Sequence, residues 1–289
     1  MNSSNFKHYV ITRFNVPYPQ AMEGDTPKGI KPDYLKQRFE VFDRYTVPSL
    51  QNQTCKDFVW VVLFDKRTPE PFMGKILKYK DDGVFRPVFV EKLDYANKTV
   101  RELVEEEDID NLPVITSRVD NDDAIVNTYV ESIQLAAKEI LPKERYLSSP
   151  YVFRFDTKEK TLTKYKMRKN HFVSRTGMLD DVGANVYHLS QDEMPKDARY
   201  YDIVPGIHSI EIVHESNLLN NTKYKFKGIL SKEEYKTAKE TCEFDALEYS
   251  KNRSVSIRKS FASLPKNVKK TIASDFRAVK RIITKGDKK

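Results

Sequence analysis

The amino-acid sequence predicts an α/β protein, a three-layer sandwich in which helices cover a mixed, mainly parallel sheet. Two observations support this prediction. Strand and helix patterns alternate along the first half of the chain, which is typical of this class. Residues 57–64 (DFVWVVLF) are apolar on both faces, as expected of a central parallel strand with helices on either side.

Each of the first elements has its own local signal. Residues 8–16 (HYVITRFNV) predict the first strand, because β-branched and aromatic residues run up to a proline. A helix is expected over 34–45, where apolar residues recur at helical spacing. Thr68 followed by Pro69 predicts the start of the next helix, with the threonine as its cap.

The remaining elements follow in chain order. The first half continues with a strand over 85–93, an acidic helix over 100–108, a strand over 112–119 and a long amphipathic helix over 124–141. The second half changes character, with a hairpin over 151–155 and 161–167, strands over 184–189 and 208–214, and helices over 232–247 and 264–283.

The composition excludes several classes of protein. The chain has 289 residues, with 50 Lys and Arg against 42 Asp and Glu, and a net charge of +8. Nine glycines exclude a collagen-like chain, and two cysteines, Cys55 and Cys242, exclude a disulfide scaffold. No apolar run reaches the roughly 20 residues that a membrane span needs, and no secretory signal pattern is present. We therefore expect a cytoplasmic protein, free or peripheral at the inner face of the membrane.

The excess positive charge lies at the C-terminus. Residues 251–289 hold thirteen Lys and Arg but two acidic residues, so the rest of the chain is mildly acidic. An apolar stripe with basic flanks over 264–283 predicts an amphipathic helix, and we expect 264–289 to meet an anionic membrane surface. A helix packed on the body and a nucleic-acid-binding helix are the alternatives. The chain is thus predicted to divide into a domain over 1–225 and a helical basic extension over 226–289.

The most informative segment is 114–123 (VITSRVDNDD), where a predicted strand ends in a cluster of carboxylates. Ligands bind at the carboxyl ends of strands in open α/β sheets. Clustered carboxylates repel each other unless a cation lies between them, and Mg²⁺ or Mn²⁺ with substrate phosphates is one solution. Asp120 and Asp122 therefore form a candidate metal–diphosphate site, with Arg118 facing a phosphate and Asp123 at the start of the next helix. The plain alternative is a polar loop that caps that helix.

Several segments together resemble one protein family. They are 12–15 (TRFN), 38–65 (RFEVFDRYTVPSLQNQTCKDFVWVVLFD) and 116–125 (TSRVDNDDAI), with weaker matches at 170–174, 185–189 and 211–221. In order, spacing and residue types they are similar to the rhamnosyltransferase family, which resembles GT-A glycosyltransferases. The resemblance implies a GT-A-like fold, a nucleotide-sugar donor, and glycosyl transfer assisted by a divalent ion.

The resemblance also implies roles for individual residues. Asp120 would lie near the ribose or the metal, and Asp122 would bind the metal as the last residue of the Asp-x-Asp motif. His214 would complete the metal ligands, since Mn²⁺ accepts imidazole. Asp65 would hydrogen-bond the nucleotide base, and Arg13 would touch the nucleotide. A turn at a strand end, a surface charge and a structural histidine are the plain alternatives for Asp65, Arg13 and His214.

The acceptor side has weaker signals. An inverting transfer needs a general base that takes the proton of the acceptor hydroxyl. Asp181, which follows the segment NHFVSRTGML, and Glu211 in SIEIVH are the candidates. His171 is interpreted as structural, and Arg38 as a solvated charge on its helix.

The sequence therefore predicts a metal-dependent glycosyltransferase of polysaccharide biosynthesis. It would pass a hexosyl or deoxyhexosyl group from a nucleoside-diphosphate donor to a hydroxyl of a glycan or lipid-linked glycan. One alternative is a metal-dependent nuclease or phosphotransferase, which would use the same acidic segment together with the basic tail. The other is a non-catalytic, membrane-associated binding protein on the same fold.

Overall fold

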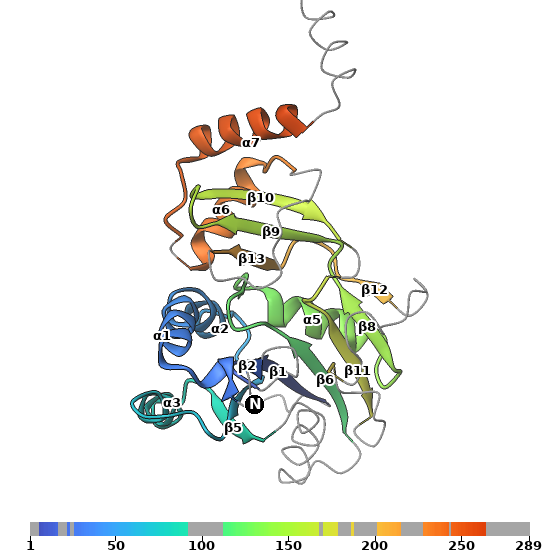
Figure 1. Ribbon diagram of the computed structural model, residues 1–289. Coiled ribbons are helices and arrows are strands. Elements are labelled where there is room, and N and C mark those ends of the chain that lie inside the picture. Colours follow the sequence, from blue (N-terminus) through green and yellow to red (C-terminus); the bar gives the residue numbers. More distant parts are fainter. Residues whose placement is uncertain are drawn as a thin grey trace, which may run out of the picture.

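The structure is a computed structural model with two packed sheets (Figure 1). It describes residues 6–16, 22–23, 26–91, 112–167, 170–178, 186–187, 201–214, 228–242 and 244–263. The larger sheet has seven strands in the order β12 (Tyr201–Ile203), β8 (Arg145–Ser148), β11 (Ser174–Met178), β6 (Pro113–Arg118), β1 (Lys7–Arg13), β4 (Val59–Asp65) and β5 (Arg86–Val90). Two short strands, β2 (Met22–Glu23) and β3 (Thr26–Pro27), pair with each other and precede a 3-10 turn, η2 (Lys28–Ile30).

The larger sheet is mixed and mainly parallel, which confirms the fold class predicted from the sequence. β1 lies parallel to both β4 and β6, and β4 lies parallel to β5. β12 pairs parallel with β8, and β11 lies antiparallel between β6 and β8. The carboxyl ends of β1, β4 and β6 therefore meet at one edge of the sheet.

β4 shows why its sequence is apolar at every position. Trp60, Val62 and Phe64 point into the core on one face of the sheet. Val61 and Leu63 point into a second core on the other face. A parallel strand that is covered on both faces has no solvent side on which to place polar residues.

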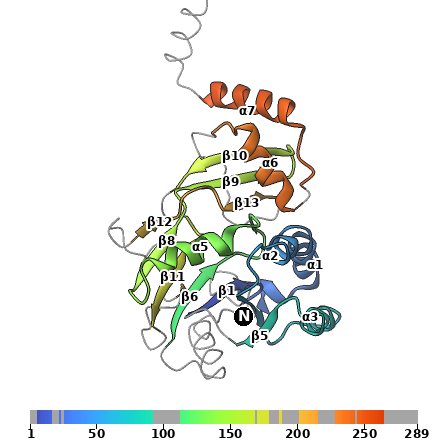
Figure 2. The same ribbon diagram turned by 180° about the vertical axis from the view of Figure 1, so that it is seen from behind.

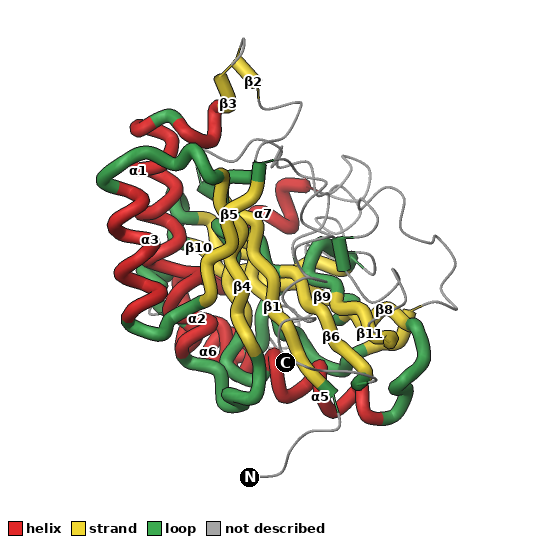
Figure 3. The backbone as a smooth tube through the Cα atoms, turned by 90° about the horizontal axis from the view of Figure 1, so that it is seen from below, coloured by secondary structure: helices red, strands yellow, loops and turns green. Residues whose placement is uncertain are grey.

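The described helices around the larger sheet pack on the same face (Figure 3). They are α1 (Pro32–Val41), the π-helical turn η3 (Phe42–Thr46), α2 (Val47–Gln51), α3 (Phe72–Asp81) and α5 (Tyr129–Lys138). Leu35, Ile76 and Ile133 from three of these helices share one core cluster with Val10 of β1. The acidic helix expected over 100–108 lies outside the described residues.

The smaller sheet and the last helices form the other end of the molecule (Figures 1 and 2). Its order is β10 (Thr161–Lys166), β9 (Tyr151–Asp156), β13 (Ser209–Val213) and β7 (Ala124–Ile125), and it packs against α6 (Lys232–Thr241) and α7 (Tyr249–Ser263). Tyr235 of α6 shares a core with Phe153 and Phe155 of β9. The Asn252 side chain of α7 donates to Leu162 O at 2.9 Å and accepts from Leu162 N at 2.8 Å. The division at residue 225 stays a prediction.

Two predicted helix starts are wrong, each for its own physical reason. The helix expected from residue 124 begins at Tyr129, because residues 124–125 pair with β13 instead. Gln53 holds the junction, since its amide donates to Val126 O at 2.8 Å and its carbonyl accepts from Val130 N at 3.0 Å. Bonds to distant segments therefore decide where this helix begins.

The second such helix is α3, which begins at Phe72 and not near residue 68. The Thr68 hydroxyl donates to Asp65 O at 2.6 Å and therefore closes the turn after β4. Further along the chain, α6 ends at residue 241 and not 247. Residues 186–187 form a turn where a strand was expected, and the helix expected over 264–283 lies outside the described residues. Among the described helices, none combines the length and the apolar composition that crossing a bilayer requires.

Candidate functional site

The polar residues predicted from the sequence gather where parallel strands end. Arg13, Asp65 and Arg118 are the last residues of β1, β4 and β6. Ile11 is the register partner of Arg118, so the end of β1 lies beside the residues that follow β6. Those residues are the DNDD turn, Asp120–Asp123.

Hydrogen bonds from distant elements hold the DNDD turn. The hydroxyl of Thr46, in η3, donates to Asn121 O at 3.1 Å and to Asp123 O at 2.8 Å. The amide of Asn121 donates to Phe14 O just beyond β1. Asp123 N donates to Asp120 O at 3.2 Å and closes the turn itself. The carboxylates therefore project from a fixed backbone.

Asp120 is paired with Arg118. The guanidinium donates to both carboxylate oxygens, from Nε at 3.2 Å and from Nη2 at 3.0 Å. Burial opposes ionisation, but the charges of Arg118, Arg13 and His171 outweigh it, so the pKa of Asp120 lies well below its usual range. Asp120 is therefore a carboxylate at any physiological pH.

Tyr187 organises the two arginines beside Asp120. The guanidinium carbon of Arg13 lies 4.4 Å from the centre of the Tyr187 ring, and that of Arg118 lies 5.4 Å from it. The Tyr187 hydroxyl donates to Ile11 O at 3.1 Å, which fixes the ring against β1. Two cations thus share one aromatic platform at the edge of the sheet.

Asp122 lies between an arginine and a histidine. Arg38 Nη1 donates to Asp122 Oδ2 at 2.6 Å, and His214 Nε2 lies 3.2 Å from the same oxygen. Burial alone would raise the pKa of Asp122, but His214 and Arg38 lower it below its ordinary value. The interpretation of Arg38 as a solvated charge is wrong, because the residue is only 6% exposed and points from α1 into this site.

Asp123 faces a histidine that was interpreted as structural. His171 Nε2 lies 2.8 Å from Asp123 Oδ2, and Ile212 N of β13 donates to Oδ1 at 2.9 Å. Burial raises the pKa of Asp123, and the nearby carboxylates add to that effect. Burial lowers the pKa of His171, but Asp123 and Asp120 outweigh it and raise the pKa above the ordinary histidine value.

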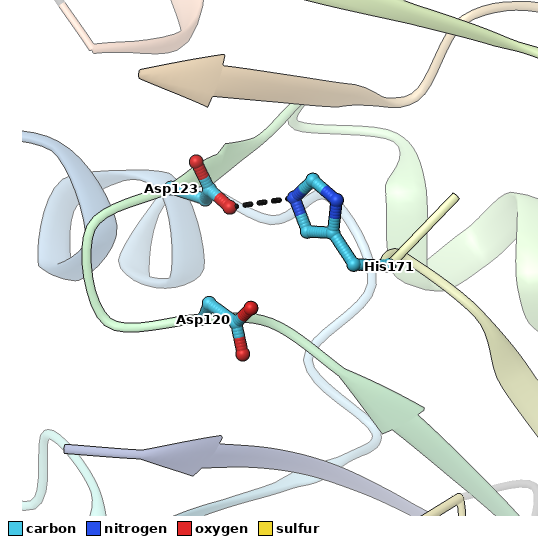
Figure 4. Close-up of side chains that lie close together, drawn as sticks. All are labelled: Asp120, Asp123 and His171. Atoms are coloured by element: carbon cyan, nitrogen blue, oxygen red, sulfur yellow. Dashed lines mark hydrogen bonds and ion pairs between the residues drawn. The ribbon is translucent and has the colours of Figure 1, made fainter. Parts of the chain in front are cut away.

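Asp120, Asp123 and His171 form a group that could hold a metal ion (Figure 4). One ligand atom from each lies within 4.8 Å of the others. The pairing of β11 with β6, in which Ser174 lies opposite Ser117, brings His171 to this site, and no sequence signal revealed it. Because these strands are antiparallel, residues before Ser174 meet residues after Ser117, and His171 arrives beside Asp120.

Asp65 is fully buried at the end of β4. Its carboxylate accepts from Arg67 three times, from the backbone N at 2.8 Å, from Nε at 3.0 Å and from Nη2 at 2.7 Å. Its backbone N donates to the Asn15 side chain at 3.0 Å, next to the end of β1. A contact between Asp65 and a nucleotide base stays a prediction.

The two predicted general bases are placed differently. Glu211 lies on β13 in a buried ion pair with Arg154, 2.6 Å from Nη2 to Oε2. The Glu211 side chain is 5% exposed, and Arg154 stacks on the ring of Tyr165 at 4.9 Å. Asp181 lies outside the described residues.

A cavity lies at the opposite end of the sheet. Its lining includes Trp60, Lys80, Phe85 and Arg86, at the amino ends of β4 and β5. It shares no residue with the DNDD turn and is not part of the candidate site.

Comparison with solved structures gives weak likenesses. Residues 1–349 of S. aureus TarS have a TM-score of 0.40 and 11% identity, covering 71% of this chain and 60% of that one. The same TarS fragment, in a structure described as a complex with UDP-GlcNAc, covers 89% and 73% at the same TM-score and identity. A cytidylyltransferase from Leptospira borgpetersenii has a TM-score of 0.37 and 12% identity, with coverages of 91% and 97%. The chain spans only 37% of the longer TarS structure.

Comparison with protein families gives a clear match. No protein of curated function matches the sequence. The model of the glycosyltransferase family described as "Putative rhamnosyl transferase" matches residues 6–225, about three quarters of the chain, including both sheets and the DNDD turn. The chain belongs to this family.

Proposed function

We propose that this protein transfers a sugar from a nucleoside-diphosphate donor to a hydroxyl of a glycan or lipid-linked glycan. Membership of a glycosyltransferase family supports the reaction class. The observation that carries the proposal is the DNDD turn at the carboxyl edge of β1, β4 and β6, with Arg13 and Arg118 beside its first carboxylate. That edge is where α/β sheets bind their ligands.

The donor set at this edge fits a divalent ion. Asp120, Asp123 and His171 offer carboxylate oxygen and imidazole nitrogen within 4.8 Å of one another, and Mn²⁺ accepts both kinds of ligand. When bound, such an ion would neutralise the diphosphate leaving group. We therefore propose these three residues as ligands, in place of the set Asp120, Asp122 and His214 expected from the motif.

Two arginines of the protein would supply further positive charge at the donor diphosphate. Arg13 and Arg118 are held by the Tyr187 ring, so their guanidiniums are positioned before a ligand arrives. A guanidinium attracts a phosphate through its charge, and Arg118 can supply that charge while its Nε and Nη2 donate to Asp120. As the glycosidic bond breaks, negative charge grows on the diphosphate, and preorganised donors stabilise it without having to rearrange.

For the acceptor side we propose Asp181 as the general base. Its competitor Glu211 is engaged by Arg154 in a buried ion pair, which favours a structural role for that carboxylate. The test is Asp181→Asn, which should lower kcat strongly while leaving donor binding unchanged. Glu211→Gln should instead lower the stability of the smaller sheet. A large loss of kcat in a stable Glu211→Gln protein would reverse this choice.

We also propose that residues 264–289 bring the enzyme to an anionic membrane surface. Their basic, amphipathic sequence follows directly on α7, whose own sequence (YSKNRSVSIRKSFAS) contains four basic residues and no acidic one. Co-sedimentation with vesicles containing anionic lipid should fall when residues 264–289 are removed. Equal binding of the truncated protein would refute the proposal.

The proposed donor site can be tested by thermal shift. UDP, GDP and dTDP are each added with and without Mn²⁺ or Mg²⁺, and one of them should raise Tm in a metal-dependent way. Asp120→Asn should abolish the shift, and Asp82→Asn, on an exposed aspartate at the end of α3, is the matched control. A nuclease would instead bind nucleic acid with steep salt dependence and show no preference for one nucleoside diphosphate.

A further inference from the structure

We infer that the cavity at the amino ends of β4 and β5 is a second ligand site, which takes an acidic saccharide unit such as a uronate or a sugar phosphate. The cavity includes Val59 and Trp60 at the start of β4, whereas the candidate donor site lies at the carboxyl edge, where β4 ends at Asp65. At about 3.3 Å per residue, the strand separates the two by about 20 Å. The choice of a saccharide as ligand rests on the proposed function.

The cavity has the size of a small-molecule site. Its volume is about 630 Å³, within the roughly 300–1,000 Å³ that such sites occupy. Its walls come from two stretches of chain, within residues 50–60 and 80–86, which meet because β4 pairs with β5. The end of α2, the start of β4 and the turn after α3 therefore border one space.

Aromatic rings form the floor of the cavity. Trp60 and Phe85 both line it, with their ring centres 5.2 Å apart, and both belong to the core of the larger sheet. Trp60 Nε1 already donates to Thr12 Oγ1 at 3.0 Å, so the indole N–H is not offered to a ligand. The floor is therefore rigid and apolar, as in sites that bind the apolar face of a ring and fix it by a few polar groups.

The polar groups around this floor are mainly cations. Lys56, Lys80 and Arg86 line the cavity, and Asp82 is the one acid among its described lining residues. Asp82 already pairs with a lysine of α3 outside the lining, at 3.0 Å, so it does not cancel the cations. Lys56 Nζ donates to Gln51 O at the wall, which uses one of its three N–H donors. A carboxylate or phosphate would therefore meet an excess of positive charge.

Lys80 differs from its neighbours on α3. Lys75 and Lys78 each pair with an aspartate, but no carboxylate in the described part of the chain pairs with Lys80. A lysine in the last turn of a helix can serve only to offset the helix dipole. Here the last carbonyls of α3 already accept from the backbone N–H groups of residues 82–84. The Lys80 ammonium is therefore available to an anion in the cavity.

Trp60 allows a direct test, because it is the single tryptophan of the chain and lines the cavity. Its fluorescence is followed while galacturonate, trigalacturonate or glucose 6-phosphate is added to the full chain, with galactose and inorganic phosphate as controls. An acidic sugar should give a saturable change with a Kd of about 1 mM or tighter, and the controls should bind at least about tenfold more weakly. Tightest binding of trigalacturonate would identify a longer acidic glycan as the source of the ligand, and tightest binding of glucose 6-phosphate a free sugar phosphate; either supports the inference.

A double variant locates the binding in the cavity. Lys56→Gln combined with Lys80→Gln removes two exposed charges and should weaken the acidic sugar by about fivefold or more. Lys138→Gln, in the last turn of α5, is the matched control and should bind like the wild type. The inference is overturned if no acidic sugar gives a saturable change, if a control binds as tightly as the acidic sugars, or if the folded double variant keeps the wild-type Kd.

The same titration separates this inference from the proposed function. Asp120→Asn, which should abolish the metal-dependent nucleotide shift, should leave the binding of the acidic sugar unchanged. Loss of that binding in Asp120→Asn would place the ligand at the donor site and overturn the second site.

Discussion

His8 should make the stability of this protein fall as the pH drops below 6.5. The residue lies on β1 in the middle of the larger sheet and is 2% exposed. Its Nε2 lies 2.7 Å from the Ser117 hydroxyl, and its Nδ1 lies 3.4 Å from the Gln134 amide. Burial lowers the pKa of His8 from 6.5 to about 3, because the surroundings disfavour the charged imidazolium.

The size of the effect follows from linkage. Between pH 6.5 and pH 3 the unfolded chain binds a proton at His8 that the folded chain does not. The free energy of unfolding therefore rises with pH across that window and is lost as the pH falls. Each pH unit corresponds to about 1.4 kcal/mol, so His8 should cost about 2 kcal/mol at pH 5 relative to pH 7.5.

Urea unfolding of the wild type and of His8→Gln, at pH 7.5, 6 and 5, measures this term. Glutamine keeps a donor and an acceptor at this position and does not titrate. Other groups, including His171, whose raised pKa acts in the opposite direction, are common to both proteins and cancel in the difference. The wild type should lose about 2 kcal/mol more than His8→Gln between pH 7.5 and 5. Parallel curves for the two proteins would refute the argument.

Three further predictions concern contacts around the site and the smaller sheet. Asn252→Ala removes two hydrogen bonds between α7 and β10 and should cost about 2–3 kcal/mol in urea unfolding; Ser254→Ala, on the exposed face of α7, should cost less than about 0.5 kcal/mol. Thr46→Val removes the hydroxyl that holds two carbonyls of the DNDD turn, and calorimetry should show severalfold weaker Mn²⁺ binding at a cost of about 1–2 kcal/mol in stability. Tyr187→Ala should weaken binding of the favoured nucleoside diphosphate by about three- to thirtyfold. Tyr187→Phe, which keeps the ring but loses the bond to Ile11 O, should weaken it less.

The elements that the sequence predicts well are those whose signal is local. The strands β1, β4 and β6 and the hairpin of β9 and β10 follow from runs of apolar and β-branched residues. The start of α5 does not, because Gln53, more than seventy residues earlier in the chain, holds Val126 and Val130 in place. A helical pattern over 124–141 cannot reveal that its first turn is pulled into the smaller sheet.

The candidate site also has a part that the sequence reveals and a part that only the structure reveals. The DNDD turn is visible in the sequence, because its residues are adjacent and follow a strand. The residues that contact its carboxylates cannot be identified from the sequence, since Arg38 comes from α1 and His171 from the residues before β11. Spacing along the chain carries no information about which cation meets which carboxylate. For His171 the pairing of β11 with β6 supplies it, and for Arg38 the packing of α1 on the sheet does.

These partners also make the site depend on both sheets. Asp123 follows the larger sheet, yet its Oδ1 accepts from Ile212 N on β13 of the smaller sheet. Asp122 is approached by His214, which directly follows that same strand. A carboxylate that loses such a partner stays buried without compensation, which costs more than the contact itself contributes. The arrangement of charges at the DNDD turn is therefore complete only when the smaller sheet has docked, and substitutions in the core around Ile212 should disturb metal and donor binding even though they touch neither.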